Sequence, residues 1–276
     1  MPTQHDLTWD TPTVFLSDLH INGGKRDQKI INNLKTLFSP HTQPNNSELK
    51  QVIIPKRLVL LGDIFDFNLA YPHTIFQKHF AFYVCLRDLS QQGIEIFVFT
   101  GNHDPEQSCF LSTLGITIIQ QAIDVQLFGK TVRLEHGDLL EPNLFKRLLC
   151  HLVRSSFVRF LARCLPANLL WSLTQHWGTQ EFQKEFQNRT ENLDYSLHQA
   201  HQKELDSIIK AHWPILKKQG IDHWIFGHFH QALAWPNPSS TAQVFVLGEQ
   251  VNLYTYLYWD EQGASLKSFN EPIHDS

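Results

Sequence analysis

The chain has 276 residues and a formal charge of −4 at pH 7. Hydrophobic residues make up 42% of it and charged residues 18%, a globular composition that excludes a mainly disordered chain. The acidic balance argues against a protein that binds duplex DNA. Histidine, the commonest metal ligand among side chains, occurs 16 times.

Cysteine usage and the N-terminal sequence indicate where the protein works. The four cysteines form no CxxC pair, which is typical of reduced thiols and not of a disulfide scaffold. The first residues contain no basic start and no apolar run, so we expect no secretory signal. No apolar stretch approaches 18 residues, so we expect no membrane-spanning helix. We therefore expect a cytoplasmic protein that is able to associate peripherally with the inner face of the membrane.

The first hundred residues alternate short apolar runs with helical patterns. Strands are predicted over residues 13–20, 56–63 and 94–104, helices over 27–38 and 77–91, and a polar loop over 40–51. This alternation predicts βαβ units and a largely parallel sheet. Sites gather at the carboxyl ends of such strands, so the polar residues that follow each run are candidate site residues.

The second half of the chain has a different pattern. Alternating residues over 116–138 predict strands joined by a turn near Gly129 and Lys130. Residues 139–219 are predicted to be helical, and strand patterns resume at 223–230, 242–249 and 253–260. We therefore predict an α/β domain formed by residues 1–138 and 220–276, with a helical insertion, or cap, over 139–219.

Five short motifs carry side chains that bind metal ions. They are DLH at 18–20, GDIFD at 62–66, GNHD at 101–104, HGD at 136–138 and GHFH at 227–230. In an extended chain residues i and i+2 share a face, so Asp18 and His20 are expected to reach one ion together, as are His228 and His230. Carboxylate, amide and imidazole ligands without a thiolate favour Mn²⁺, Fe, Zn²⁺ or Mg²⁺. One such motif alone is typical of an ordinary turn, but five in order predict a metal site.

This ordered set resembles the calcineurin-like metallophosphoesterases, whose signature is DxH, GDxxD, GNH[DE], a later His and GHxH. The resemblance spans about residues 14–250. It implies a four-layer α/β/β/α sandwich with two mixed sheets packed face to face. It also implies a dinuclear site for two divalent metal ions, with Mn²⁺ expected first. Carried over, Asp18, His20 and His230 hold one ion, Asn102, His136 and His228 hold the other, and Asp63 bridges them.

The resemblance implies catalytic roles as well. Two divalent ions activate a water for attack on phosphorus, so no protein nucleophile is required. His103 is implied to stabilise the transferring phosphoryl group or to protonate the leaving oxygen. Asp66 is expected to orient the imidazole of His103. Asp104 and Asp138 are expected to cap turns or orient ligands.

The predicted insertion is basic and amphipathic. No acidic residue lies between Pro142 and Gln180, whereas five basic residues do: Lys146, Arg147, Arg154, Arg159 and Arg163. Apolar residues recur among them at three- and four-residue steps. Such a face suits an anionic lipid surface or an acyl-chain groove. The alternative is that the apolar stripe is ordinary core and that its basic residues are solvated.

A helical insertion between the HGD and GHxH motifs is similar to that of the UDP-2,3-diacylglucosamine pyrophosphatases of lipid A synthesis. In that subfamily the cap holds two acyl chains beside the metals. The resemblance implies attack at the α-phosphorus to give UMP and 2,3-diacylglucosamine 1-phosphate. Arg154 and Arg159 are candidates for binding phosphate or uridine. In two respects the chain departs from the commoner bacterial form, which has Arg at the position of His103 and a cysteine- and aspartate-rich stretch after HGD.

Two alternatives remain open. In the first alternative, the same metal site acts on a phosphoprotein or a dinucleoside polyphosphate. These substrates do not need a basic, apolar cap. A non-catalytic binding module on the same fold is the other, although the chain keeps all seven ligand positions and His103. We expect no nucleic-acid partner, because the chain is acidic and lacks a long basic tract, and no obligate protein partner.

Overall fold

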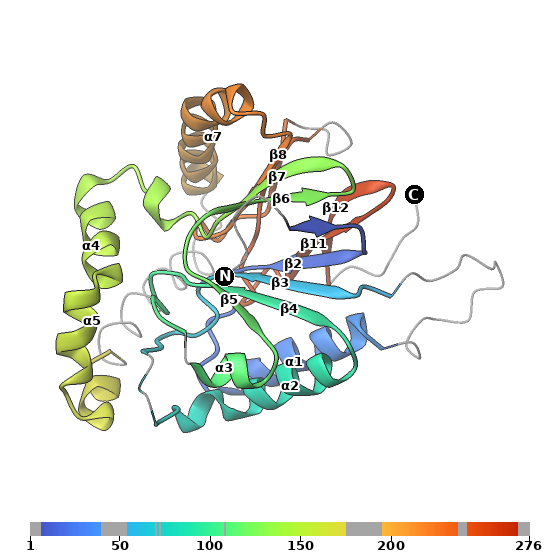
Figure 1. Ribbon diagram of the computed structural model, residues 1–276. Helices are drawn as coiled ribbons and strands as arrows, with labels where there is room; N and C mark the ends of the chain where they lie inside the picture. Colours follow the sequence, from blue (N-terminus) through green and yellow to red (C-terminus); the bar gives the residue numbers. More distant parts are fainter. Residues whose placement is uncertain are drawn as a thin grey trace. The chain divides into compact units, whose positions relative to one another are not determined.

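The computed structural model in Figure 1 describes residues 7–39, 54–69, 71, 73–107, 109–174, 195–236 and 242–269. The polar loop expected over 40–51 lies outside the described residues. Contacts along the chain divide it into two units, which we take separately. Unit 1 comprises Met1–Gly137 with Ile221–Ser276, and unit 2 comprises Asp138–Gly220.

One six-stranded sheet of unit 1 carries the first predicted βαβ pattern, in the order β12-β11-β2-β3-β4-β5. Its parallel strands are β2 (Thr13–Leu16), β3 (Arg57–Leu61), β4 (Glu95–Phe99) and β5 (Thr117–Ile119). At the other side β11 (Thr255–Asp260) runs antiparallel to both β2 and β12 (Gly263–Ser268). The intervening helices are α1 (Lys25–Leu37), α2 (Phe80–Gln91), preceded by a 3-10 turn (Gln77–His79), and α3 (Cys109–Thr113). Figure 1 shows these helices together on one face of the sheet.

The second sheet of unit 1 has the order β1-β6-β7-β8-β10-β9. Its strands are β1 (Thr8–Trp9), β6 (Ile123–Leu127), β7 (Lys130–Leu134), β8 (His223–Phe226), β9 (Leu233–Trp235) and β10 (Val244–Val246). Strands β6 and β7 form the predicted hairpin, whose turn is Phe128 and Gly129, one residue earlier than expected. Both turn residues have positive φ, 47° and 73°, which matches the right-handed twist of the flanking strands.

Strand residues of the first sheet alternate between two hydrophobic clusters. Leu58 and Leu60 of β3 belong to the cluster that contains the apolar faces of α1 and α2. Val59 and Leu61 belong to a second cluster, which also contains residues of β6, β7 and β8, such as Val125. Because both faces of β3 are covered, the strand is a continuous apolar run, and the two sheets pack face to face. The predicted fold class, an α/β fold with two mixed sheets flanked by helices, is confirmed.

Unit 2 is helical throughout its described part. A 3-10 turn (Asp138–Leu140) precedes α4 (Leu144–Arg154), α5 (Ser156–Arg163), a helical stretch over 167–174 and α7 (Tyr195–Lys218). The Asn143 side chain caps α4, because its Oδ1 accepts hydrogen bonds from the Phe145 and Lys146 N–H groups at 3.0 and 3.1 Å. Within the described residues, no helix has the length and apolar character needed to cross a bilayer.

Candidate metal centre and active site

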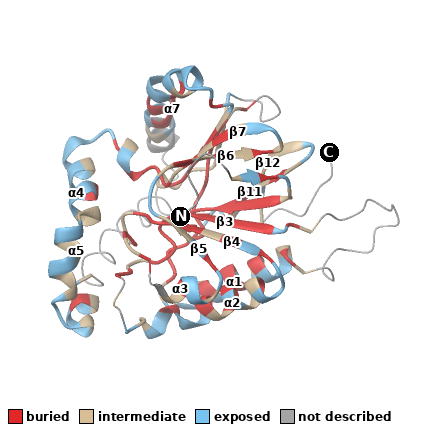
Figure 2. Cartoon of the chain, viewed as in Figure 1, coloured by how far each residue is buried: buried red, intermediate tan, exposed pale blue. Residues whose placement is uncertain are grey.

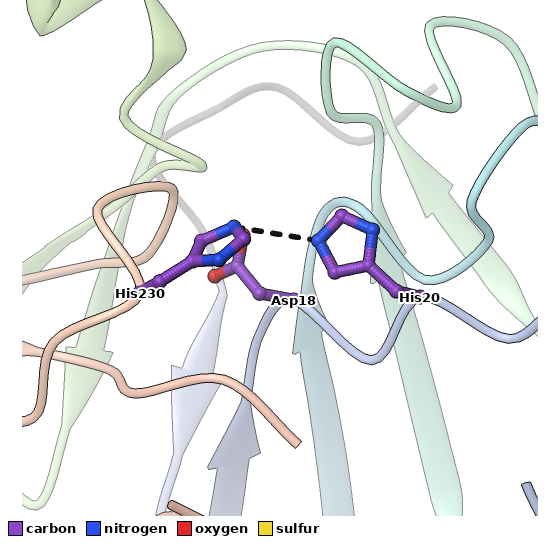
Figure 3. Close-up of side chains that lie close together, drawn as sticks. All are labelled: Asp18, His20 and His230. Atoms are coloured by element: carbon purple, nitrogen blue, oxygen red, sulfur yellow. Dashed lines mark hydrogen bonds and ion pairs between the residues drawn. The ribbon is translucent and has the colours of Figure 1, made fainter. Parts of the chain in front are cut away.

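The structure gathers six of the predicted metal ligands into two groups. One group is Asp18, His20 and His230, and the other is Asp63, His136 and His228. In each group the ligand atoms all lie within 4.8 Å of one another. Figure 3 shows the first group, with the His230 ring facing His20 and the Asp18 carboxylate beside them.

Each ligand lies just beyond the carboxyl end of a strand. Asp18 and His20 follow β2, Asp63 follows β3, and Asn102 follows β4, three neighbouring parallel strands. In the other sheet His136 follows β7, while His228 and His230 follow the parallel strand β8. Parallel strands bring their carboxyl ends to one edge, and this edge is where ligands meet in α/β proteins.

The backbone presents these ligands differently from the sequence-based expectation. We expected Asp18 and His20, and likewise His228 and His230, to share a face of an extended segment. Instead, β2 ends at Leu16 and β8 at Phe226, and the ligands follow in the left-handed region. Among the described residues seven non-glycine residues have positive φ, and five of them are predicted ligands: Asp18, His20, Asp63, His228 and His230. Asp18 and His20 nevertheless belong to one group, as expected, whereas His228 and His230 belong to different groups.

Two glycines of the motifs are required for close approach. A Cβ on Gly101 would lie 2.0 Å from Asp63 Oδ1, and one on Gly227 would lie 1.9 Å from Ser17 Oγ. Neither contact is tolerable for a real side chain. The glycines of GNHD and GHFH therefore allow the loops after β4 and β8 to pass directly against the ligands of other strands.

In the first group two ring nitrogens face each other. His20 Nε2 lies 3.3 Å from His230 Nε2, which in turn lies 3.4 Å from Asp18 Oδ1. The opposite nitrogen of His20, Nδ1, lies 3.2 Å from Asp66 Oδ1. That contact with a carboxylate places the imidazole proton on Nδ1 and directs the lone pair of Nε2 toward Asp18 and His230.

The second group is arranged by the same logic. His136 Nδ1 lies 2.7 Å from the Leu61 carbonyl oxygen, which only accepts, so Nδ1 carries the proton. His136 Nε2 then lies 3.2 Å from Asp63 Oδ2 and 3.2 Å from Asn102 Oδ1. The amide oxygen of Asn102, the seventh predicted ligand, thus joins this group.

The donor sets fit divalent cations. Two imidazole nitrogens at 3.3 Å repel each other when both carry lone pairs, so either a cation lies between them or one ring, such as that of His230, carries a proton there. Burial raises the pKa of Asp18, but the hydrogen bond and charge of His230 outweigh it and lower that pKa to about 2. Burial lowers the pKa of His20, which favours the neutral, metal-binding imidazole. Ionised carboxylate, neutral imidazole and amide oxygen together suit Mn²⁺, Fe or Zn²⁺.

His103 lies beside the first group and is not one of its ligands. Its ring lies edge-on to that of His20, with centroids 5.0 Å apart. Its Nδ1 lies 2.9 Å from the Asp66 main-chain oxygen, so Nδ1 is a donor and Nε2 is the other ring nitrogen. Burial opposes protonation of His103, yet the charges of Asp63 and Asp66 and the hydrogen bond to Asp66 raise its pKa overall.

Asp66 therefore differs from its expected arrangement. We expected its carboxylate to orient His103, but that carboxylate faces His20 and accepts a 2.8 Å hydrogen bond from Asn22 Nδ2. The main-chain carbonyl of Asp66 is the group that contacts His103. The side chain is drawn toward His20 because α1 and the loop before it place Asn22 and Arg26 on that side, with the Arg26 guanidinium donating to the His20 carbonyl.

Asp104 joins the loops that follow β3 and β4. Its buried carboxylate accepts hydrogen bonds from the main-chain N–H groups of Asp63, Ile64, Phe65 and Gly101 and from the Gln107 side chain. Burial and the nearby Asp63 charge raise the pKa of Asp104, while the N–H donors oppose that rise. The expected turn-capping position of Asp104 is thus the one observed.

Sequence reasoning missed several residues around the site. Asn68 donates its main-chain N–H to the His103 carbonyl at 3.1 Å, and its side chain contacts Gln107 Oε1 at 3.3 Å. The main-chain N–H of Gln250 donates to the Asp18 carbonyl at 3.1 Å. None of these residues belongs to a short motif, and their roles depend on contacts across the fold, so only the position of Asn68 close after GDIFD gave any signal.

The two candidate substrate-binding arginines lie in unit 2. Arg154 forms a two-pronged ion pair with Asp138, with N–O distances of 2.6 and 2.9 Å. Arg159 donates to the Arg154 carbonyl at 2.6 Å and to Ser156 Oγ at 3.3 Å. These contacts engage the Arg154 guanidinium with a partner of its own unit, and Asp138 orients that arginine.

The sequence also matches a known family. The model of the family described as calcineurin-like phosphoesterase matches residues 11–232. The chain belongs to this family. It is accordingly a metal-dependent phosphoesterase, and the family implies divalent metals at a site such as the two groups above.

Several curated relatives of this phosphoesterase have the name UDP-2,3-diacylglucosamine hydrolase. The protein of that name from Porphyromonas gingivalis is 26% identical over 226 residues, which cover 78% of this chain and 84% of the relative. That from Pseudomonas fluorescens is 27% identical over 218 residues, covering 77% and 82%. That from Xanthomonas oryzae pv. oryzae is 24% identical over 265 residues, covering 93% and 98%.

Proposed function

We propose that this phosphoesterase hydrolyses the pyrophosphate of UDP-2,3-diacylglucosamine to UMP and 2,3-diacylglucosamine 1-phosphate. The observation that carries the chemistry is the pair of His and Asp groups at one edge of the sandwich, with His103 beside them. The name of the three relatives described above supports this substrate over a phosphoprotein or a dinucleoside polyphosphate.

The ligand roles belong to the same proposal. Asp18, His20 and His230 would hold one divalent ion, Asn102, His136 and His228 would hold a second, and Asp63 would serve both. The bound ions supply an activated water and neutralise charge on the phosphoryl oxygens. We expect Mn²⁺ to support activity, because carboxylate and amide oxygens suit this ion, and Fe or Zn²⁺ is the alternative because imidazole nitrogens suit those metals.

The protein groups around the ligands hold and move protons. His103 donates its Nδ1 proton to the main-chain carbonyl oxygen of Asp66, so its Nε2 is the nitrogen available to contact substrate. A proton on Nε2 either stabilises charge on the transferring phosphoryl group or passes to the leaving oxygen. Hydrolysis breaks the bond between the α-phosphorus and the bridging oxygen, and that oxygen leaves on the sugar 1-phosphate, with the attacking water retained in UMP.

The proposed substrate also predicts where the protein works. A sugar nucleotide with two acyl chains resides in a lipid bilayer, so the protein is expected to reach it from the cytoplasmic membrane surface. Arg154 and Arg159 remain candidates for contacts with phosphate or uridine, in which case Asp138 orients Arg154 for that contact.

The test is a Mn²⁺-supplemented hydrolysis assay on UDP-2,3-diacylglucosamine, with bis-p-nitrophenyl phosphate as a generic diester alongside. The proposal predicts efficient UMP release from the lipid and slow turnover of the diester. The matched control is UDP-N-acetylglucosamine, which has the same pyrophosphate and no long acyl chains, and it should turn over poorly. Diester hydrolysis without UMP release from the lipid would leave the phosphoesterase intact and overturn the substrate.

A further inference from the structure

The carboxylate of Asp66 has a side-chain partner on each of its two oxygens. Oδ1 lies 3.2 Å from His20 Nδ1, and Oδ2 accepts a 2.8 Å hydrogen bond from Asn22 Nδ2. In Figure 3 the opposite edge of the His20 ring, that of Nε2, faces His230. A line of contacts therefore runs from Asn22 through Asp66 and His20 to the first ligand group. Asn22, where this line begins, belongs to none of the five motifs.

The Asn22 amide is held so that its nitrogen faces Asp66. Its Oδ1 accepts a 3.0 Å hydrogen bond from the Gly24 N–H, a contact to the main chain two residues on that is common for asparagine. A main-chain N–H only donates and an ionised carboxylate only accepts. The amide therefore satisfies both neighbours in one orientation, with Oδ1 on Gly24 and the Nδ2 donor on Asp66.

The main chain of the Asn22 loop is fixed by the start of α1. Asp27 is buried, and its Oδ2 accepts hydrogen bonds from the N–H groups of Asn22 at 3.1 Å and Gly23 at 2.6 Å. Figure 2 shows α1 with a buried and an exposed side, and Ile30 and Leu34 are among its buried residues. The position of the Asn22 amide is thus set by a helix that packs into the core of unit 1.

The hydrogen bond from Asn22 keeps the Asp66 carboxylate available to His20. The His20 side chain is 1% exposed, whereas that of Asp66 is 23% exposed, so water competes for the carboxylate. A carboxylate released from Asn22 is free to turn to water, and the imidazole then loses the partner that keeps its proton on Nδ1. A proton on Nε2 instead occupies the lone pair with which His20 binds a metal ion.

We propose that Asn22 is a positioning residue for the metal ion of the first group. It is not itself a ligand, since it acts through Asp66 and His20. The proposal rests on the ligand roles proposed above, because Asn22 affects metal binding only if His20 is a ligand. Its effect is confined to one ion, because His136 of the second group is oriented by the Leu61 carbonyl oxygen instead.

Mn²⁺ titration calorimetry of the metal-free full chain tests the proposal in two backgrounds. In His136→Ala, which leaves the first group complete, Asn22→Ala should lower the Mn²⁺ affinity at least tenfold, the usual cost of losing such a partner. In His20→Ala, which leaves the second group complete, the same change should alter the Mn²⁺ affinity less than twofold. That unchanged binding also shows that the Asn22→Ala chain is folded.

The matched control is Gln28→Ala. This change removes a 2.9 Å amide hydrogen bond of the same kind, from Gln28 Nε2 to Asn32 Oδ1, on the exposed side of α1. It should leave the Mn²⁺ affinity unchanged in both backgrounds. A tenfold loss in this control would show that any weakening of α1 disturbs the site, and would overturn the specific role of Asn22.

Asn22→Ser separates a positioning role from simple support of the loop. A serine hydroxyl can accept a hydrogen bond from the Gly24 N–H, but it is too short to reach Asp66. In the His136→Ala background Asn22→Ser should therefore lose Mn²⁺ affinity as Asn22→Ala does. Affinity equal to that of Asn22 itself in this background would mean that the residue only shapes the loop, and would overturn the proposal.

The same titrations distinguish a failure of this proposal from a failure of the ligand roles. If His20→Ala alone binds two ions with the affinities of the wild type, His20 is not a ligand and both proposals fail. If His20→Ala loses one ion but Asn22→Ala has no effect in the His136→Ala background, the ligand roles hold and the role of Asn22 is overturned. Equal losses in both backgrounds would also overturn it, because a general loosening of unit 1 would then explain them.

Discussion

A left-handed backbone conformation is shared by five of the seven candidate metal ligands. For an ordinary residue this conformation costs about 1 kcal/mol or more, and five predicted ligands adopt it at one edge of the fold. The surrounding loops offset that cost, for example through the hydrogen bond from the His228 N–H to Asp18 Oδ2 at 2.9 Å. Such concentrated strain is typical of a functional site.

Replacing Gly227 with Ala tests the close approach at this edge. The new Cβ would lie 1.9 Å from Ser17 Oγ and 2.7 Å from Asp18 Oδ2, so Asp18 must move, and Mn²⁺ affinity by titration calorimetry should fall at least tenfold. Gly93→Ala is the control. Gly93 has φ of 85° with nothing within 4 Å of an added Cβ, so its variant should lose about 1 kcal/mol of stability and keep its metal affinity. Equal metal affinity in both variants would contradict the steric account.

Replacing His103 with Ala separates catalysis from metal binding. The ring is not part of either ligand group, so metal content measured by mass spectrometry should stay near that of the wild type. Turnover should fall about 10²- to 10⁴-fold, the usual range for loss of a general acid. A parallel loss of metal would show instead that His103 supports a ligand.

The sequence predicted this set of residues better than it predicted their geometry. All seven candidate ligands lie in or beside the two groups, since motif order is visible in a sequence. The expected pairing of Asp18 with His20 is observed, although it arises from positive φ and not from an extended segment, whereas the expected pairing of His228 with His230 was wrong. Nothing in these motifs indicates positive φ at a non-glycine residue. The partner of the Asp66 carboxylate depends on Asn22 and Arg26, which no motif contains.

At the scale of strands and loops, the sequence predicted some elements and missed others. The apolar runs of β2, β3 and β4 were located, but each predicted strand extended past the observed end, because the prediction carried the strand into the polar motif that follows the apolar run. The short strands β1 and β9 have no clear pattern of their own and depend on pairing with a neighbour.

The carboxylate of Asp104 joins the loops after β3 and β4 by accepting hydrogen bonds from both. Asp104→Ala would leave several buried N–H donors without an acceptor, so we expect the free energy of unfolding to fall by about 2–4 kcal/mol. Urea denaturation measures this. The control is Asp88→Ala, which removes only a surface ion pair with Arg87 and should change stability by less than about 1 kcal/mol. Equal effects would mean that the loops hold together without Asp104.

The stability of the whole molecule depends on pH, and His79 contributes to that dependence. This histidine is buried and stacks on Phe65 with centroids 4.1 Å apart, and burial lowers its pKa from 6.5 to about 3. Between pH 6.5 and 3 the imidazole of His79 is therefore protonated in the unfolded chain and neutral in the folded chain. The free energy of unfolding falls as the pH drops through this range. Between pH 6.5 and 5, the wild type should lose about 1–2 kcal/mol more than His79→Phe in urea denaturation. Identical pH slopes for the two proteins would contradict this contribution.

At the scale of the whole chain, strand alternation predicted βαβ units and a largely parallel sheet, whereas the two mixed sheets were implied only by the resemblance to the calcineurin-like metallophosphoesterases. Amphipathicity predicted the helices of unit 2, yet it could not say which face meets water, because a core stripe and an exposed stripe have the same period.

The central claim, a phosphoesterase whose metals are held by the two His and Asp groups, is tested most directly by one paired measurement. Bound Mn²⁺ per chain and hydrolysis of bis-p-nitrophenyl phosphate are determined for the wild type and for Asp63→Ala. The account predicts about two ions per wild-type chain, with both metal and activity lost together in the variant. Wild-type activity in Asp63→Ala, or activity in a wild-type chain stripped of metal, would contradict it.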